Sequence, residues 1–264
     1  MRSHLLIATL ILLAAVAAYA WADDLSGDDI VKKMSNRAVS NTTISESKMT
    51  VVETNGTSGI QRVRNMRTRA KKINNLNHVV TTFLAPPDVR GVKFLVIENP
   101  SGENEQRIYL PAMRRVRRIT AANRNESSMG STFSYADLQI RNPDEAKHSR
   151  LKDMVLAGQD CYVVQSIPKN PTDTDYSKLI YWVRKDNFLP IRGEFYNKEG
   201  KLWKVLEVFG VEKKPDGTWV AKQTKMSDVI NRRVTLMEIL SYQVNVAIDD
   251  GVFTDRFLSD ESQE

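Results

Sequence analysis

The sequence predicts a mainly-β protein in which one antiparallel sheet curls into a barrel wide enough to hold a cavity. Segments rich in Val, Ile, Thr and aromatic residues alternate with turn signals at short intervals, as in hairpin-connected strands. The turn signals Asn55-Gly56, Asn197 to Gly200 and Pro215-Asp216-Gly217 supply the positive φ angles that hairpins need. About a dozen such strands in one sheet favour a curved or closed arrangement over a flat one.

The start of the chain predicts a secretory signal peptide. Arg2 precedes the apolar run Leu5 to Val16, and Ala20 and Ala22 are the small residues that signal peptidase requires. No cysteine that could take a lipid lies near this cleavage site. We therefore expect cleavage of residues 1–22 and export of residues 23–264 as a single β domain.

A short amphipathic helix opens the mature chain. Ser26 followed three residues later by Asp29 is a capping-box pattern. Apolar residues then recur at helical spacing, and they are Ile30, Val31, Met34 and Ala38. The nearby acidic residues lie where the helix dipole favours negative charge, so we expect them to stabilise the helix rather than bind calcium.

Strands joined by short turns are predicted for most of the remaining chain. The predicted strands are 47–54, 59–73, 76–85, 92–98, 105–110, 115–120, 151–157, 161–168, 177–185, 190–197, 201–213, 218–227 and 233–248. The last strand alternates with period 2, which predicts one buried face and one wet face. The face expected to be buried consists of Leu240, Tyr242, Val244, Val246 and Ile248, opposite Ser241, Gln243 and Asn245.

Residues 121–149 break the strand pattern. They contain the turn formers Gly130 and Pro143 and the large apolar residues Met129, Phe133, Tyr135 and Leu138. A segment of this length inside a compact domain is usually functional, and this one is too apolar to be disordered. We expect it either to pack as core or to cover the mouth of the barrel as a lid.

The chain is basic, with a formal net charge of +6. A basic surface attracts nucleic acid, anionic lipid headgroups or an acidic partner, and export makes nucleic acid the least suitable of these. The basic residues cluster at 62–72 and at 114–118. In the first cluster Arg62 and Arg64, and then Arg67, Arg69 and Lys71, repeat with period 2. This pattern indicates either the solvated face of a strand or a surface that steers an anionic headgroup or partner.

Patterns typical of catalytic and metal sites are missing from the sequence. His78 and His148 are isolated from other metal ligands, and there is no HExxH, paired CxxC, P-loop or GxGxxG motif. The only cysteine, Cys161, lies in an apolar run and is expected to be a buried core residue. The sequence therefore predicts no catalytic residue, no metal site and no cofactor.

Two blocks of motifs resemble a known protein family. The first block comprises Arg107 to Met113, Val116 to Ile119 and Met129 to Leu138; the second comprises Phe188 to Tyr196, Gly200 to Val205, Trp219 to Ala221 and Val252 to Thr254. Both are similar to the LolA-like family of outer-membrane lipoprotein-sorting proteins, from whose pattern the chain departs at Ser128, Thr132 and Ala136. The resemblance implies an unclosed barrel capped by helices, an apolar cavity for acyl chains and no catalytic residues.

The resemblance further implies a periplasmic carrier of lipoproteins or lipids that makes transient membrane contact and serves a transporter of the resistance-nodulation-division (RND) type. The residues expected to line its cavity or lid are Phe83, Phe94, Tyr109, Leu110, Met129, Phe133, Tyr135, Leu138 and Trp203. Those expected to steer a partner or a lipid headgroup are Arg114, Arg115, Arg117 and Arg118. Two alternatives stay open: an envelope sensor or adaptor that regulates a membrane partner, and an enzyme that acts on envelope lipids.

Overall fold

The structure is a computed structural model, and it describes residues 24–262 apart from residues 38, 56–57, 101 and 140–141. The predicted signal peptide, residues 1–22, lies outside the described residues, as does Ala38 of the predicted helix. Within the part that is described, no helix is long and apolar enough to cross a membrane.

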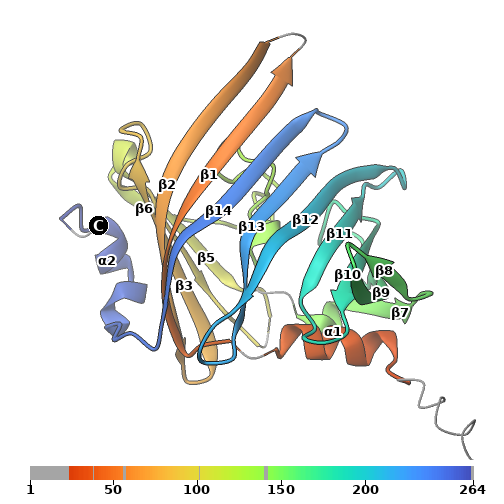
Figure 1. The fold of residues 1–264 in the computed structure, drawn as a ribbon. Coiled ribbons are helices and arrows are strands. Elements are labelled where there is room, and N and C mark those ends of the chain that lie inside the picture. The colour runs from red at the N-terminus through yellow and green to blue at the C-terminus, as the bar shows by residue number, and fades with distance from the viewer. Residues whose placement is uncertain (1–23, 38, 56–57, 101, 140–141, 263–264) are drawn as a thin grey trace, which may run out of the picture.

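An antiparallel sheet of 14 strands forms the body of the molecule (Figure 1). The strands are β1 (Thr42–Asn55), β2 (Ser58–Ile73), β3 (Leu76–Ala85), β4 (Lys93–Ile97), β5 (Glu105–Leu110), β6 (Arg115–Arg118), β7 (Ala146–Arg150), β8 (Met154–Leu156), β9 (Gln159–Pro168), β10 (Lys178–Arg184), β11 (Pro190–Tyr196), β12 (Leu202–Lys213), β13 (Trp219–Asp228) and β14 (Arg233–Val244). Each predicted strand is present, which confirms the mainly-β antiparallel fold.

The strands follow the order β6-β5-β4-β3-β2-β1-β14-β13-β12-β11-β10-β9-β7, with β8 paired to β9 outside this path. Most neighbours in the sheet are neighbours in the chain, as the hairpin turns predict. Pairing of β1 with β14 joins the two halves of the sheet. Among the described residues the end strands β6 and β7 do not pair with each other, so the barrel is unclosed.

Several details differ from the sequence prediction, one of them being the end of the last strand, which is Val244 rather than residue 248. Residues 146–149, which were expected to continue an irregular segment, belong to β7 and pair with β9. Leu240, which was expected on the buried face of β14, is 62% exposed. The cause is a bulge, since Glu46 pairs with Ser241 and Ser47 with Ile239, so that Leu240 has no partner on β1. The bulge shifts the alternation of β14 by one residue, which a simple period-2 pattern cannot anticipate.

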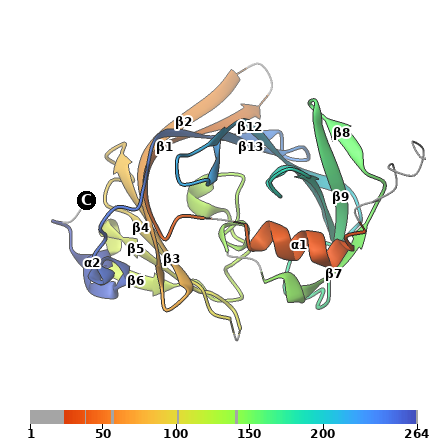
Figure 2. The same ribbon diagram turned by 60° about the horizontal axis from the view of Figure 1, so that its bottom comes forward.

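Helix α1 (Gly27–Ser35) has the predicted capping box. The Ser26 side chain accepts from the Asp29 backbone amide at 3.1 Å, and the Asp29 carboxylate accepts from the Ser26 backbone amide at 3.0 Å. The helix crosses the open end of the barrel beside β7 and β9 (Figure 2). A Cβ atom at Gly27 would lie 2.8 Å from backbone atoms of His148, Ser149 and Arg150 in β7, so glycine permits this close approach.

A second helix, α2 (Asp255–Ser259), covers the convex face of the sheet. Its Phe257 and Leu258 pack with Val80 of β3 and Leu95 of β4 in one apolar cluster. Lys93 is 1% exposed, and its Nζ donates to the carbonyls of Phe257 at 2.9 Å and Asp260 at 2.6 Å. The lysine thus places a buried positive charge at the C-terminus of the helix, where the helix dipole favours it.

Candidate functional site

The chain's own central segment, residues 121–138, covers the concave face of the sheet. It lies inside the curve of the sheet (Figure 2) and contains the 3₁₀ turns η2 (Ser128–Gly130) and η3 (Ala136–Leu138). Met129 and Tyr135 pack in one apolar cluster with strands β1 to β5, whereas Phe133 packs in a second cluster with α1 and strands β9 to β13. The central segment therefore bridges the two halves of the barrel from the inside.

Hydrogen bonds tie the backbone of the central segment to the sheet. The Thr132 amide donates to Oγ1 of Thr235 at 2.9 Å, and the Thr132 hydroxyl donates to the carbonyl of Met226 at 3.0 Å. Gln106 donates from Nε2 to the carbonyl of Tyr135 at 2.9 Å. Because these groups are buried, each bond satisfies a polar group that water cannot reach.

Arg64 also binds the central segment. It was expected on the solvated face of a strand, but it is buried. Its guanidinium donates to the carbonyl of Met129, and the side chain is 8% exposed rather than solvated. Even-numbered residues of β2, such as Arg64 and Met66, face the concave side. Arg69 has the opposite parity and lies 5.7 Å from the ring of Phe257 on the convex side. The period-2 arginines therefore occupy both faces of the sheet.

A buried ion pair fixes the end of the central segment. Nζ of Lys204 on β12 lies 3.0 Å from Oδ2 of Asp137, and the two side chains are 6% and 2% exposed. The Tyr176 hydroxyl donates to Oδ1 of Asp137 at 2.9 Å and accepts from Nζ of Lys204 at 2.9 Å. All three groups thus share one hydrogen-bonded network, which is the arrangement that compensates burial of charge.

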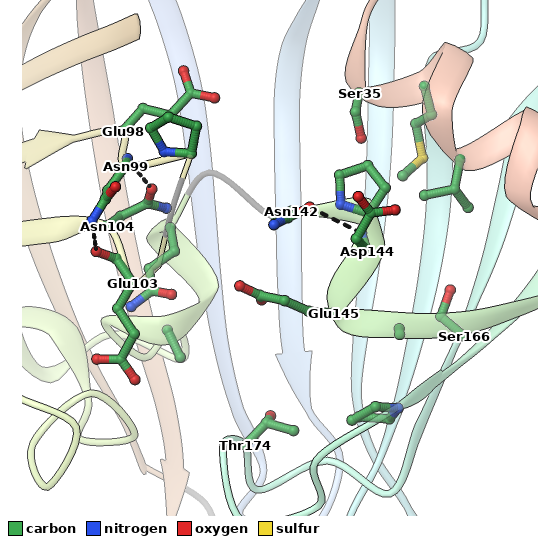
Figure 3. Close-up of a pocket in the computed structure, with 18 of the residues that line it drawn as sticks. Ser35, Glu98, Asn99, Glu103, Asn104, Asn142, Asp144, Glu145, Ser166 and Thr174 are labelled. Atoms are coloured by element: carbon green, nitrogen blue, oxygen red, sulfur yellow. Dashed lines mark hydrogen bonds between the residues drawn. The ribbon is translucent and has the colours of Figure 1, made fainter.

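A cavity of about 540 Å³ opens at the end of the barrel where α1 lies. Its volume is within the range of small-molecule sites. Val31 and Met34 of α1, together with Leu179 and Tyr181 of β10, form an apolar wall. Amide and charged side chains line most of the remainder. Figure 3 shows Glu98, Asn99, Glu103 and Asn104 on one side, facing Asn142, Asp144 and Glu145 on the other.

Several charged groups of the cavity are already paired. Arg124 forms ion pairs with Glu103 and, at 3.5 Å, with Asp173. The Glu98 carboxylate accepts from the backbone amide of Asn77 at 2.8 Å and from its side chain at 2.6 Å. These contacts hold the polar rim in place, so the shape of the cavity is largely formed without a ligand.

His148 lies in the cavity wall with a partner on each ring nitrogen. Its Nε2 lies 2.8 Å from the carbonyl of Pro143, and its Nδ1 lies 2.7 Å from Oγ of Ser166. Because a carbonyl only accepts, Nε2 carries a proton. The histidine thereby links the 3₁₀ turn η4 (Pro143–Glu145) to β7 and β9, which is a structural role.

Most of the residues predicted to bind acyl chains lie in the apolar clusters of the sheet. Phe83, Phe94, Leu110, Met129 and Tyr135 share the cluster on β1 to β5, and Phe133 and Trp203 share the one beside α1. Tyr109 lies on the opposite, convex face, where its hydroxyl donates to Glu261 at 2.9 Å. Leu138 is 39% exposed. None of these residues lines the 540 Å³ cavity described above.

The four arginines predicted to steer a partner lie together on an edge of the sheet. Arg114 has a left-handed backbone after the turn η1 (Pro111–Met113), and the other three belong to the edge strand β6. Arg114, Arg115 and Arg118 are exposed, and Arg117 is half-buried. Within the described part of the chain, no carboxylate forms an ion pair with any of them.

The cavity at α1 was not predicted from the sequence. Its lining comes from turns and element ends that are far apart in the chain, such as residues 98–100, 102–104 and 142–146. The one local signal is the density of Asn, Asp and Glu in these turns, and turns are commonly polar for reasons unrelated to binding.

Together, the unclosed antiparallel barrel, the helix across its open end and the internal segment define a protein of the LolA-like fold class. The chain belongs to a family described as uncharacterized proteins, whose family model matches residues 75–260. No curated protein matches the sequence.

Several solved structures share this fold. A domain described as an outer membrane lipoprotein-sorting protein, from Vibrio parahaemolyticus, has a TM-score of 0.82 and 26% identity, covering 88% of this chain and 98% of that one. A DUF1329 family protein from Desulfovibrio piger has a TM-score of 0.81 and 28% identity, covering 88% and 97%. A LolA superfamily protein from Nitrosomonas europaea shares the fold, with a TM-score of 0.68 and 15% identity, covering 88% and 99%.

Proposed function

We propose that this protein is a periplasmic carrier that binds the acyl chains of lipoproteins or lipids and delivers them across the cell envelope. The observation that carries the proposal is the apolar concave face of the unclosed barrel, which the central segment covers as a bound chain would. The similarity to a lipoprotein-sorting domain supports it. An acyl chain crosses water only when it is covered, because each buried CH₂ contributes about 0.8 kcal/mol.

Loading requires the central segment to leave at least part of the concave face. The segment is held by specific polar contacts, among them the hydrogen bonds of Thr132 and Tyr135, those from Arg64 and Arg233 to the carbonyls of Met129 and Gly130, and the pair of Asp137 with Lys204. A segment held in this way can exchange with a ligand of similar apolar area. The central segment would then act as a lid that substitutes for cargo when the carrier is empty.

The proposed carrier consists of residues 23–264 after removal of residues 1–22, and an RND-type transporter drives delivery. Catalysis has no part in this function. The binding step relies on burial of apolar surface, and release relies on return of the central segment to the concave face.

The test is to isolate the exported protein, measure its intact mass and extract the bound molecules for mass spectrometry. We expect a mass that corresponds to residues 23–264 and co-purified molecules with acyl chains. A protein that holds none of these and does not take up a fluorescent acyl probe after delipidation contradicts the proposal. Cross-linking in the envelope then separates delivery from sensing, since a carrier contacts a transporter and a sensor contacts a regulator.

A further inference from the structure

Arg37, which follows α1, is a charged group without a charged partner in the wall of the 540 Å³ cavity. Its Nη1 donates to the carbonyl of Met34 at 3.0 Å, and its Nε is buried without a hydrogen-bond partner. Among the residues that the structure describes, no carboxylate forms an ion pair with it. Burial lowers the pKa of the guanidinium, and the smaller effect of Tyr242 acts in the opposite direction.

A partly buried guanidinium with an unused donor is unfavourable unless something binds it. A buried charge without a partner is strongly unfavourable, because it has lost its hydration and gained no counter-ion in return. An arginine remains charged at any physiological pH, so it cannot avoid this penalty by losing its proton. The missing partner is therefore expected to be an anionic group that enters the cavity.

The neighbourhood of Arg37 suits an amphiphile rather than a small anion. Val31 and Met34 lie three residues apart on one side of α1, Arg37 follows the C-cap residue of the helix, and all three line the cavity. With Leu179 and Tyr181 they place an apolar wall next to the guanidinium. A chain can lie along this wall while its charged end reaches Arg37.

The carboxylates of the cavity limit where the anion can bind. Glu103 and Asp173 are paired with Arg124, and Glu98 is held by Asn77. Asp144 and Glu145 lie on η4, across the cavity from Glu98 (Figure 3). Lys72, an exposed lysine of the lining, pairs across the β2–β3 hairpin with Asn77 and so lies near the Glu98 carboxylate. Arg37 is thus the cation of the lining to which we assign the negative charge of a ligand.

We infer that the cavity binds the anionic headgroup of an acyl amphiphile, a carboxylate or a phosphate, on Arg37, with the chain against Val31, Met34 and Leu179. This inference rests on the proposed function and narrows it. A carrier that uses this site distinguishes charged from uncharged lipids, which an apolar groove alone cannot do.

The test compares three ligands that share a twelve-carbon chain: dodecanoate, dodecyl phosphate and uncharged dodecanol. Each displaces a fluorescent acyl probe from the delipidated mature protein. We expect the two anions to bind roughly tenfold to a hundredfold more tightly than dodecanol, as for a hydrogen bond to a charged group. Tighter binding of dodecanoate indicates that the natural ligand is a fatty acid, and tighter binding of dodecyl phosphate indicates a phospholipid.

Substitution of Arg37 assigns the preference to this residue. Arg37→Met is expected to remove the advantage of the anions and to leave dodecanol unchanged, while Arg37→Lys retains part of it. Arg256→Met, at an exposed position on α2, is the matched control and should behave as wild type. Thermal unfolding of each variant checks that it is folded.

The outcomes distinguish this inference from the proposed function. Equal binding of all three ligands by the wild type, or an undiminished anion preference in folded Arg37→Met, overturns the inference and leaves the carrier intact. Failure of every ligand and of the acyl probe to bind the wild type contradicts the proposed function itself.

Discussion

Single residues decide how firmly the central segment is held, and the pair of Asp137 and Lys204 is the clearest case. Asp137→Asn leaves the Lys204 charge buried without its counter-ion, so we expect the free energy of unfolding to fall by about 3–5 kcal/mol. The double variant Asp137→Asn with Lys204→Met removes both charges and should recover much of this loss. Urea unfolding of the single and double variants measures the coupling.

An exposed ion pair provides the matched control for that experiment. Lys48 and Glu238 pair at 2.6 Å with side chains that are 37% and 23% exposed. Solvent screens such a pair, so Glu238→Gln should change stability by less than about 1 kcal/mol. A loss of similar size at both sites would show that burial of Asp137 has no special effect.

Asp153 makes the attachment of the α1 region dependent on pH. Its carboxylate accepts from Arg150 at 2.7 Å and lies 2.7 Å from Nζ of Lys185, while Arg150 also donates to the carbonyl of Leu25 at 3.0 Å. The hydrogen bond from Arg150, followed by that from Lys185, lowers the pKa of Asp153 below its ordinary value of 3.8.

A depressed pKa in the folded state means that this stabilisation is complete above pH 3.8 and is lost as the pH falls below that value. Asp153→Asn should therefore be less stable than wild type near pH 7, by up to about 1 kcal/mol, since the pair is partly exposed. The difference should shrink as the pH falls to about 3. Urea unfolding at several pH values tests this, and a difference that is constant down to that pH contradicts it.

Among the structural elements, the central segment most directly links stability to binding. Phe133 is half-buried against the cluster beside α1. Phe133→Ala should lower the free energy of unfolding of the empty protein by about 2–4 kcal/mol, because the site loses apolar contacts. If the segment is a lid, the same change weakens the covered state and raises the affinity for an acyl probe several-fold.

Thermal unfolding and probe titration of Phe133→Ala measure both effects. Phe257→Ala is the control, since Phe257 is buried on the convex face and should reduce stability without altering probe affinity. A loss of stability in Phe133→Ala with unaltered probe affinity would assign the central segment to the core and remove its role as a lid.

The elements also show how far the sequence determines this fold. The strands were predictable because alternation and hairpin turns are local, and α1 because its capping box is local. The bulge at Leu240 was not, because it depends on the register with β1. The inward direction of the Arg64 side chain could not be predicted for a similar reason. Its hydrogen-bond partner, the Met129 carbonyl, belongs to a segment far away in the sequence.

The candidate site was less predictable than the fold. Apart from the exposed Leu138, the proposed apolar residues lie in apolar clusters, but composition cannot separate a side chain that packs as core from one that lines a cavity. Arg37 was not distinguished from other basic residues, because the feature that singles it out is a buried Nε without a hydrogen-bond partner. That property exists only after the elements have been assembled.

For the molecule as a whole, charge is distributed unevenly over the unclosed barrel. Arg114, Arg115, Arg117 and Arg118 lie on and beside the edge strand β6 and have no carboxylate partner in the described part of the chain. Two roles are physically reasonable. Charged side chains protect an edge strand from pairing with another chain, and a cluster of one sign attracts an anionic surface from a distance.

Charge reversal separates these two roles. Replacing all four arginines by Glu should slow association with anionic vesicles by roughly tenfold at low salt, because steering acts during encounter. The difference should largely vanish when the Debye length falls to about 3 Å at 1 M salt. The control variant carries the same change in net charge at exposed positions around the other half of the barrel, where Glu replaces Lys32, Lys152, Lys169 and Lys201. This control should slow association much less. Stopped-flow measurements at several salt concentrations test this. If both quadruple variants associate at the same rate, the arginines do not steer the protein, and a rise in self-association of the arginine variant would instead assign them to protection of the β6 edge.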